Sequence, residues 1–145
     1  MNFQPKNPNY IKAIEGVLEK QNFMQHIGFN LTKITPGYME GEIQFKDFLK
    51  QQSGFLHGGV IATLADLVSG FAAYSLVAEN EYVVTSDLKI SYLNPGVCEK
   101  VLAKGWVIKA GSRMHFCESE VLDADSGLMI AKASATMVIV PKVTL

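Results

Sequence analysis

The stretch between Lys50 and Glu79 carries one formally charged side chain, Asp66, and is otherwise dominated by apolar and small residues. From Val60 to Ala78 the composition is that of a helix enclosed on most sides, which requires a surrounding layer of protein. An ionised carboxylate is costly to desolvate, so one placed in such a helix is expected to have a partner or a chemical task. We therefore expect a buried helix that carries a functional acid.

This apolar stretch approaches the length of a membrane span, but polar residues interrupt it and no Lys or Arg anchors flank it. A buried helix is therefore expected, and no membrane association. The net charge of −1 with no basic block gives no basis for nucleic-acid binding. Cys98 and Cys117 lack metal-ligand spacing, which indicates reduced thiols and no metal site.

The 145 residues are expected to form a single domain, 1–145, with a flexible segment at residues 1–9. The N-terminal segment lacks the apolar core of a signal peptide, so a cytoplasmic protein is expected. Apolar periodicity and turn residues predict an outer helix over 10–21 and strands over 27–34, 38–45, 83–93, 101–109, 114–122 and 128–140. Such a long apolar helix is buried only if a curved antiparallel sheet wraps around it. The predicted class is therefore α+β in two layers.

The sequence His57-Gly58-Gly59 begins the apolar helix. The first backbone N–H groups of a helix have no partner inside it, and the helix dipole favours negative charge there. The N–H of Gly58 is the natural donor to an oxygen that develops negative charge, and glycine lets a ligand approach the backbone closely. An acid together with such a helix start suggests a site that acts on a carbonyl group.

The segment from Gln51 to Asp66, QQSGFLHGGVIATLAD, resembles the signature of hotdog-fold acyl-CoA thioesterases of the phenylacetate-pathway (PaaI-like) type and their 4-hydroxybenzoyl-CoA thioesterase relatives. In that pattern an amide residue precedes the His by six positions and a carboxylate follows it by nine. The resemblance continues through Ser86 to Gly96 and covers roughly residues 25 to 140. The family pairs Asn with Asp or Gln with Glu, whereas this chain pairs Gln51 with Asp66.

The resemblance implies hydrolysis of acyl-CoA or aroyl-CoA thioesters, with coenzyme A as part of the substrate and no metal or redox cofactor. It implies a carboxylate that attacks the thioester or activates water, with the Gly58 N–H stabilising the oxyanion. His57 is expected to orient groups, and Thr85 to help hold the water. Strand alternation instead puts Ser86 on the face shared with Val84 and Leu88, so Thr85 requires a bulged strand. Contacts to coenzyme A are implied for Gly59, Gly111, Ser112 and Arg113.

Nine residues of helix correspond to about 900° of rotation, which puts Asp66 on the opposite side of the helix from His57. One chain is then not expected to bring both to the same carbonyl, whereas Gln51, His57 and Gly58 of one chain can face Asp66 of another. The resemblance implies the same arrangement. We therefore predict a homodimer with two shared sites, doubled into a homotetramer.

Each candidate also has a structural interpretation. Asp66 can be a buried acid bonded to a neighbouring hydroxyl such as that of Thr63, Gln51 can be a loop amide, and Arg113 can be a solvated charge at a hairpin. A set of apolar residues can line an acyl pocket or simply form core: Phe55, Leu56, Phe71, Tyr74 and Met114. The alternative functions are a non-catalytic acyl-CoA-binding or sensing protein and a hotdog 3-hydroxyacyl thioester dehydratase, whose His-Phe-Pro-type motif is absent here.

Overall fold

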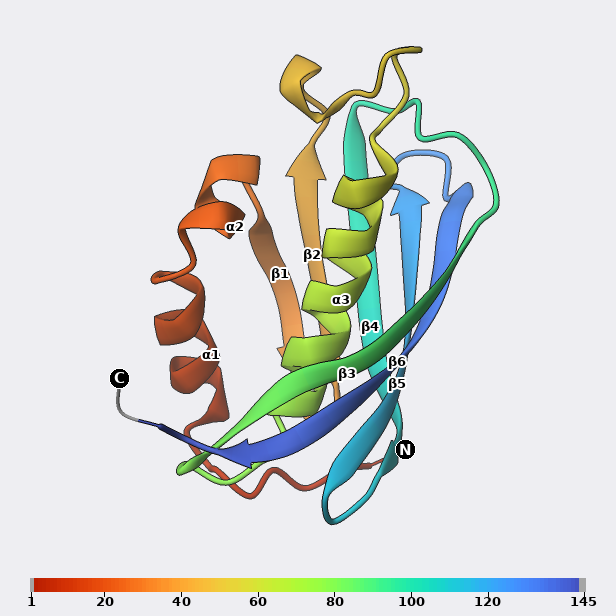
Figure 1. Ribbon diagram of the computed structural model, residues 1–145. Coiled ribbons are helices and arrows are strands. Elements are labelled where there is room, and N and C mark those ends of the chain that lie inside the picture. Colours follow the sequence, from red (N-terminus) through yellow and green to blue (C-terminus); the bar gives the residue numbers. More distant parts are fainter. Residues whose placement is uncertain (1, 144–145) are drawn as a thin grey trace.

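A six-stranded antiparallel sheet curves around one long helix in the computed structural model, which describes residues 2–143 (Figure 1). The strand order across the sheet is β1-β2-β4-β5-β6-β3, so β1 and β3 form its edges. The predicted α+β class, with the sheet wrapped around the helix, is confirmed. In chain order the elements are α1 (Tyr10–Leu18), α2 (Asn22–Ile27), β1 (Asn30–Thr35), β2 (Tyr38–Gln44), a 3-10 turn η1 (Asp47–Leu49), α3 (Gly58–Tyr74), β3 (Glu81–Tyr92), β4 (Lys100–Ala110), β5 (Met114–Asp123) and β6 (Met129–Pro141).

The apolar stretch forms α3, which ends at Tyr74 rather than near Ala78. Its side chains Leu64 and Val68 are fully buried against the concave face of the sheet. The helix approaches β4 so closely that a Cβ at Gly105 would lie 2.4 Å from the Val68 carbonyl carbon. Glycine at this position is therefore a condition of the helix–sheet packing. No helix among residues 2–143 has the length and apolar character needed to cross a bilayer.

Side chains fix both ends of α3. At the start, Nδ1 of His57 accepts the N–H of Gly59 at 2.8 Å, which makes His57 the N-cap. At the end, the Ser75 hydroxyl donates to the Ala72 carbonyl at 2.6 Å and accepts the Gly37 N–H at 2.7 Å. Because Gly37 lies in the β1–β2 turn, the end of the helix is held against the sheet.

The N-terminal part of the domain differs from the prediction. The first helix ends at Leu18 rather than near residue 21. Residues 22–27 form a second helix, so the strand predicted to begin at Ile27 begins at Asn30. Met24 and Ile27, three residues apart, both bury their side chains, which is helical spacing that the short segment hides in the sequence. Gly28 then ends α2 with φ of 75°, a left-handed conformation that suits glycine.

Strand β3 contains a bulge that overturns the predicted alternation of its side chains. Thr85 pairs with Met137 but Asp87 pairs with the preceding residue of β6, Thr136, so Ser86 is an extra residue. Val84 was expected on the same face as Leu88 and is instead 49% exposed. Thr85 takes the inward position.

Residues 2–9 have no helix or strand, but they touch the domain core. The Lys6 N–H donates to the Leu76 carbonyl at 3.3 Å, and Asn7 is buried. The flexibility of residues 1–9 stays a prediction, and Met1 lies outside the described residues.

Candidate active site

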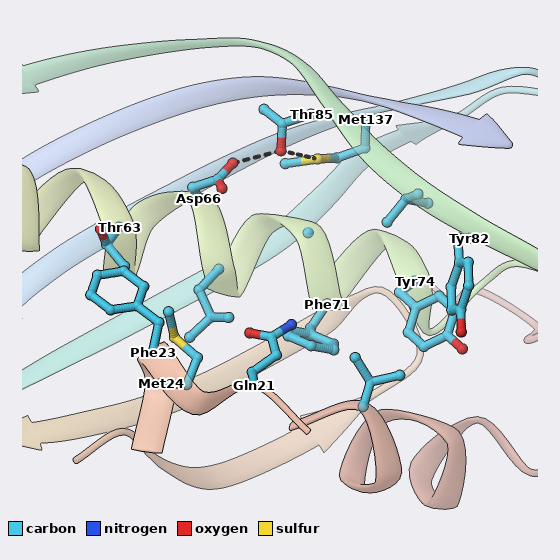
Figure 2. Close-up of a pocket in the computed structure, with 14 residues that line it drawn as sticks. Gln21, Phe23, Met24, Thr63, Asp66, Phe71, Tyr74, Tyr82, Thr85 and Met137 are labelled. Carbon is cyan, nitrogen blue, oxygen red and sulfur yellow. Dashed lines mark hydrogen bonds between the residues drawn. The ribbon is translucent and has the colours of Figure 1, made fainter. Parts of the chain in front are cut away.

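Asp66 and Thr85 form a hydrogen-bonded pair between α3 and β3 (Figure 2). The Thr85 hydroxyl lies 2.7 Å from Oδ1 of the half-buried Asp66, and also 3.5 Å from Sδ of Met137. Within residues 2–143, no other group is hydrogen-bonded to the Asp66 carboxylate and no cation pairs with it. One carboxylate oxygen is thus held in place while the other remains available to accept a proton or bind water.

The pairing shows which hydroxyl Asp66 contacts. The partner of Asp66 is the hydroxyl of Thr85, whereas the Thr63 hydroxyl donates to the Gly59 carbonyl at 2.9 Å. The bulge at Ser86 turns Thr85 toward the helix, which is the condition under which a role for Thr85 was expected.

Asp66 opens into a cavity of about 330 Å³ that runs beside α3. Its polar end holds Asp66 and Thr85, and its far end holds Tyr74 and Tyr82 (Figure 2). Of the expected acyl-pocket residues, Phe71 and Tyr74 line this cavity, Phe55 and Leu56 line another, and Met114 lines none of those described. Most of the remaining lining is apolar: Val17, Phe23, Met24, Leu67, Gly70, Val83 and Met137.

The start of α3 presents one uncommitted backbone donor. The N–H of Gly59 is bound by the His57 ring, and those of Val60 and Ile61 reach the His57 carbonyl at 3.0 and 3.2 Å. Among residues 2–143, no group accepts the N–H of Gly58. A free N–H at a helix start is suited to an anionic oxygen.

Tyr92 is a candidate that the sequence analysis missed. Its hydroxyl donates to the Gly58 carbonyl at 3.0 Å, and its ring packs over Gly58. The contact fixes the peptide that follows Gly58 and the entry into α3. The available signal was an aromatic residue at the end of a predicted strand, just before the turn at Asn94-Pro95-Gly96.

Gln51 lies in a tight turn in front of α3. Its N–H donates to the Phe55 carbonyl at 2.8 Å, its Oε1 accepts the Ser53 N–H, and Gly54 adopts φ of 85°. Gln51 and Gly58 line a shallow cavity of about 330 Å³ together with Tyr92. The side-chain amide nitrogen of Gln51 has no hydrogen-bond partner in the described part of the chain.

The chain thus holds its candidates in separate places. Asp66 and Thr85 share one cavity, Gln51 and Gly58 share a second, and His57 lines a third. The third cavity also contains Gly59, and it adjoins the first because Phe23 and Thr63 line both. One chain therefore does not place Gln51 or Gly58 in the cavity of Asp66.

The hairpin at Gly111, Ser112 and Arg113 connects β4 to β5. The Gly111 N–H donates to the Met114 carbonyl at 2.9 Å, while Ser112 and Arg113 are exposed. In Figure 1 this hairpin lies beyond the end of α3, far from the helix start at Gly58. The structure therefore does not bring these predicted coenzyme A contacts together with Gln51, His57 and Gly58.

Three further titratable side chains, two cysteines and one histidine, are unsuited to catalysis. Burial raises the pKa of Cys117 to about 12, and burial together with Asp123 and Asp125 raises the pKa of Cys98 to about 11, so both thiols stay protonated. Burial lowers the pKa of His115, which keeps its ring neutral. No group of three or more His, Cys, Asp or Glu residues in the range 2–143 could hold a metal ion.

Comparison with known proteins identifies the class that this fold and site define. Residues 53–130 match the family model described as the thioesterase superfamily, so the chain belongs to that superfamily. A protein of Saccharolobus solfataricus whose name calls it an esterase is 33% identical over 85% of this chain and 87% of its own. Human acyl-coenzyme A thioesterase 13 is 26% identical over 86% of this chain and 90% of its own.

A crystal structure of a thioesterase family protein from Silicibacter pomeroyi superposes with a TM-score of 0.89 and 28% identity, covering 92% of this chain and 99% of that one. The chain is therefore a thioester hydrolase with the hotdog fold, and the resemblance stated from the sequence is confirmed.

Proposed function

We propose that this thioesterase hydrolyses acyl-CoA or aroyl-CoA thioesters, with Asp66 as the catalytic carboxylate. The observation that carries the proposal is the Asp66–Thr85 pair at the mouth of an apolar cavity. The cavity takes the acyl group, and the free carboxylate oxygen faces the thioester carbonyl. Human acyl-coenzyme A thioesterase 13 and the Escherichia coli medium/long-chain acyl-CoA thioesterase YigI, which is 31% identical over 58% of this chain, support the coenzyme A thioester class.

In the proposed reaction, Asp66 removes a proton from a water molecule whose oxygen attacks the thioester carbonyl carbon. A tetrahedral oxyanion forms, and its oxygen accepts a hydrogen bond from the Gly58 N–H. Its collapse breaks the carbon–sulfur bond, and the leaving thiolate takes up the proton that Asp66 removed from water, which restores the Asp66 carboxylate and gives a free acid and coenzyme A. A thiol of pKa about 8.5, the value for cysteine, leaves without a strong general acid. Direct attack by Asp66 through an anhydride uses the same carboxylate position and is the alternative first step.

The groups of this mechanism come from two chains. The cavity of Asp66 contains neither Gln51 nor Gly58 of the same chain, so the site is complete only when a second copy supplies them. We place the contact at β3, an edge strand with exposed backbone groups and exposed apolar side chains at Tyr82, Val84 and Tyr92. The homodimer then has two shared sites and pairs further into a homotetramer.

The remaining assignments rest on the family resemblance. Gly59 of one chain and the hairpin residues Gly111, Ser112 and Arg113 of the other contact the coenzyme A part of the substrate, and His57 orients the helix start. The reaction needs no metal and no redox cofactor, since a carboxylate and an N–H group supply the chemistry. Cys98 and Cys117 as free thiols favour the cytoplasm as the compartment.

The test measures free-thiol release from short-chain, long-chain and aromatic acyl-CoAs with wild type and Asp66→Asn. The amide keeps the size of the side chain but cannot take a proton, so turnover is expected to fall about 10²-fold or more. Asp125→Asn in the exposed turn between β5 and β6 is the matched control and keeps full turnover. Equal turnover in Asp66→Asn and wild type would refute the role of Asp66. Turnover of no thioester by wild type would leave an acyl-CoA carrier.

A further inference from the structure

Three residues of α3 mark the part of the cavity that runs from the acid to its far end. Asp66, Gly70 and Tyr74 follow one another at intervals of four residues, and all three line the cavity. At about 1.5 Å of rise per residue, the Cα atoms of Asp66 and Tyr74 lie about 12 Å apart. Figure 2 shows the rings of Tyr74 and Tyr82 at one end and the carboxylate toward the other, with Thr63 and Phe23 beyond it.

Gly70 lies halfway along this path, and no neighbour within residues 2–143 packs so closely that glycine is required there. A glycine inside a helix is destabilising relative to alanine, and a Cβ at Gly70 would meet no atom within 4 Å. At Gly105, by contrast, a Cβ would lie 2.4 Å from the backbone of α3. The missing side chain of Gly70 therefore leaves space in the cavity rather than room for a neighbouring element.

The walls on either side of Gly70 are suited to a hydrocarbon. Leu67, Phe71 and Val83 line the cavity, Gln21 adds an amide to the lining, and Asp66 is its one charged residue among those described. A linear chain laid along α3 from the carboxylate would pass directly over Gly70. An extended chain advances about 1.25 Å per carbon for carbon–carbon bonds of about 1.5 Å, so the path accepts about nine or ten carbons.

We propose that Gly70 determines acyl-chain length, by leaving open the middle of a channel that runs from Asp66 to Tyr74 and Tyr82. The inference rests on the proposed function, since it takes the cavity of Asp66 as the acyl site. It assigns a linear acyl group of about ten carbons as the longest that fits fully. A large side chain at position 70 would divide the channel and leave room for a short acyl group beside Asp66.

The test uses S-butyl- and S-decyl-coenzyme A, thioethers that bind without reacting, with affinities measured by titration calorimetry. Wild type is expected to bind the decyl compound at least about 100-fold more tightly than the butyl compound. In Gly70→Leu this ratio of affinities is expected to be at least about tenfold smaller. In Gly70→Ala the ratio is expected to fall by less than in Gly70→Leu. Gly16→Leu in α1, where a Cβ also meets no atom within 4 Å, is the matched control and keeps the wild-type preference.

Circular dichroism confirms that each variant is folded, which is expected because leucine favours the helix over glycine. An unchanged decyl-to-butyl preference in Gly70→Leu would overturn the inference, as would equal weakening of both ligands or the absence of a preference in wild type. Hydrolysis of decanoyl-CoA by wild type is measured separately and tests the proposed function alone. Binding therefore distinguishes a failure of the channel from a failure of catalysis.

Discussion

Thr85 on the edge strand β3 donates its hydroxyl hydrogen toward Asp66 on the central helix, across a distance of 2.7 Å. This hydrogen bond joins the edge strand β3 to the acid on α3 at the mouth of the cavity. It orients the carboxylate without a neighbouring cation, so the charge of Asp66 is not neutralised by an ion pair within the described chain.

Removal of this hydroxyl tests its role in catalysis. Thr85→Val keeps the shape of the side chain but lacks the donor, so the carboxylate loses its orientation, and kcat is expected to fall about tenfold. Thr85→Ser restores the donor and is expected to restore most of kcat. Steady-state kinetics with the best acyl-CoA substrate measure both. Equal kcat in the Val and Ser variants would show that the hydroxyl does not position Asp66.

The N–H of Gly58 can be removed by Gly58→Pro. Gly58 is the first residue of α3, where proline is tolerated, and the preceding His57 already has the extended ψ of 135° that proline requires. A Cβ at this position would lie 3.5 Å from the Tyr92 ring, an ordinary contact. Loss of the oxyanion donor is expected to lower kcat about 10²-fold or more.

Gly58→Ala is the control for that variant, because it adds a Cβ and keeps the N–H. Its kcat is expected to stay within about threefold of wild type, a difference of under about 1 kcal/mol in the activation barrier. If Gly58→Ala is as slow as Gly58→Pro, the cause is the added bulk beside Tyr92 and the oxyanion role is wrong.

Mixing two inactive variants tests whether sites are shared between chains. Suppose that each site takes Asp66 from one chain and Gly58 from the other. A heterodimer of the Asp66→Asn and Gly58→Pro variants then has one site with both defects and one intact site. Random exchange of subunits then restores about a quarter of wild-type turnover. Thiol release measured after mixing and refolding reports this recovery. No recovery, with heterodimers present by mass spectrometry, would place each site within one chain.

His115 predicts how the stability of the protein depends on pH. The ring is buried and both of its nitrogens lack partners in the described chain; burial and the nearby Lys6 lower its pKa. Above about pH 6.5, the ordinary pKa of histidine, the folded and unfolded chains bind no proton there. Below it the unfolded chain binds more protons, so stability falls with decreasing pH until the folded pKa is reached.

The contribution of His115 to the free energy of unfolding changes by up to about 1.4 kcal/mol per pH unit. Urea unfolding at several pH values between 5 and 8 measures it. His115→Leu is expected to flatten the curve in this window, whereas His26→Gln, which changes an exposed histidine, leaves it unchanged. A slope that persists in His115→Leu would assign the pH dependence to other groups.

The sequence was sufficient for the fold because its main signal is long. An apolar helix with one acid, followed by several alternating segments, allows few arrangements other than a sheet around that helix. Shorter signals were less informative: α2 has six residues, too few to show a period, and a strand interpretation of Ile27 was wrong.

The candidate site was predicted unevenly for similar reasons. Asp66 and Gly58 are evident from composition and helix-start chemistry, whereas the orientation of Thr85 depends on a bulge that alternation cannot reveal. The contact of Tyr92 with Gly58 joins residues 34 positions apart, a pairing that only the folded chain creates.

The extra residue at Ser86 gives β3 two patterns of alternation in one strand. Before it, Val83 and Thr85 face inward, and after it Leu88 and Ile90 do so, which reverses the parity of the inward positions. A deletion of Ser86 would merge the two halves into one uniform strand, which could present either the threonine or the core residues to the helix, but not both. One inserted residue therefore lets a single strand present Thr85 to Asp66 at one end and core residues to the helix at the other.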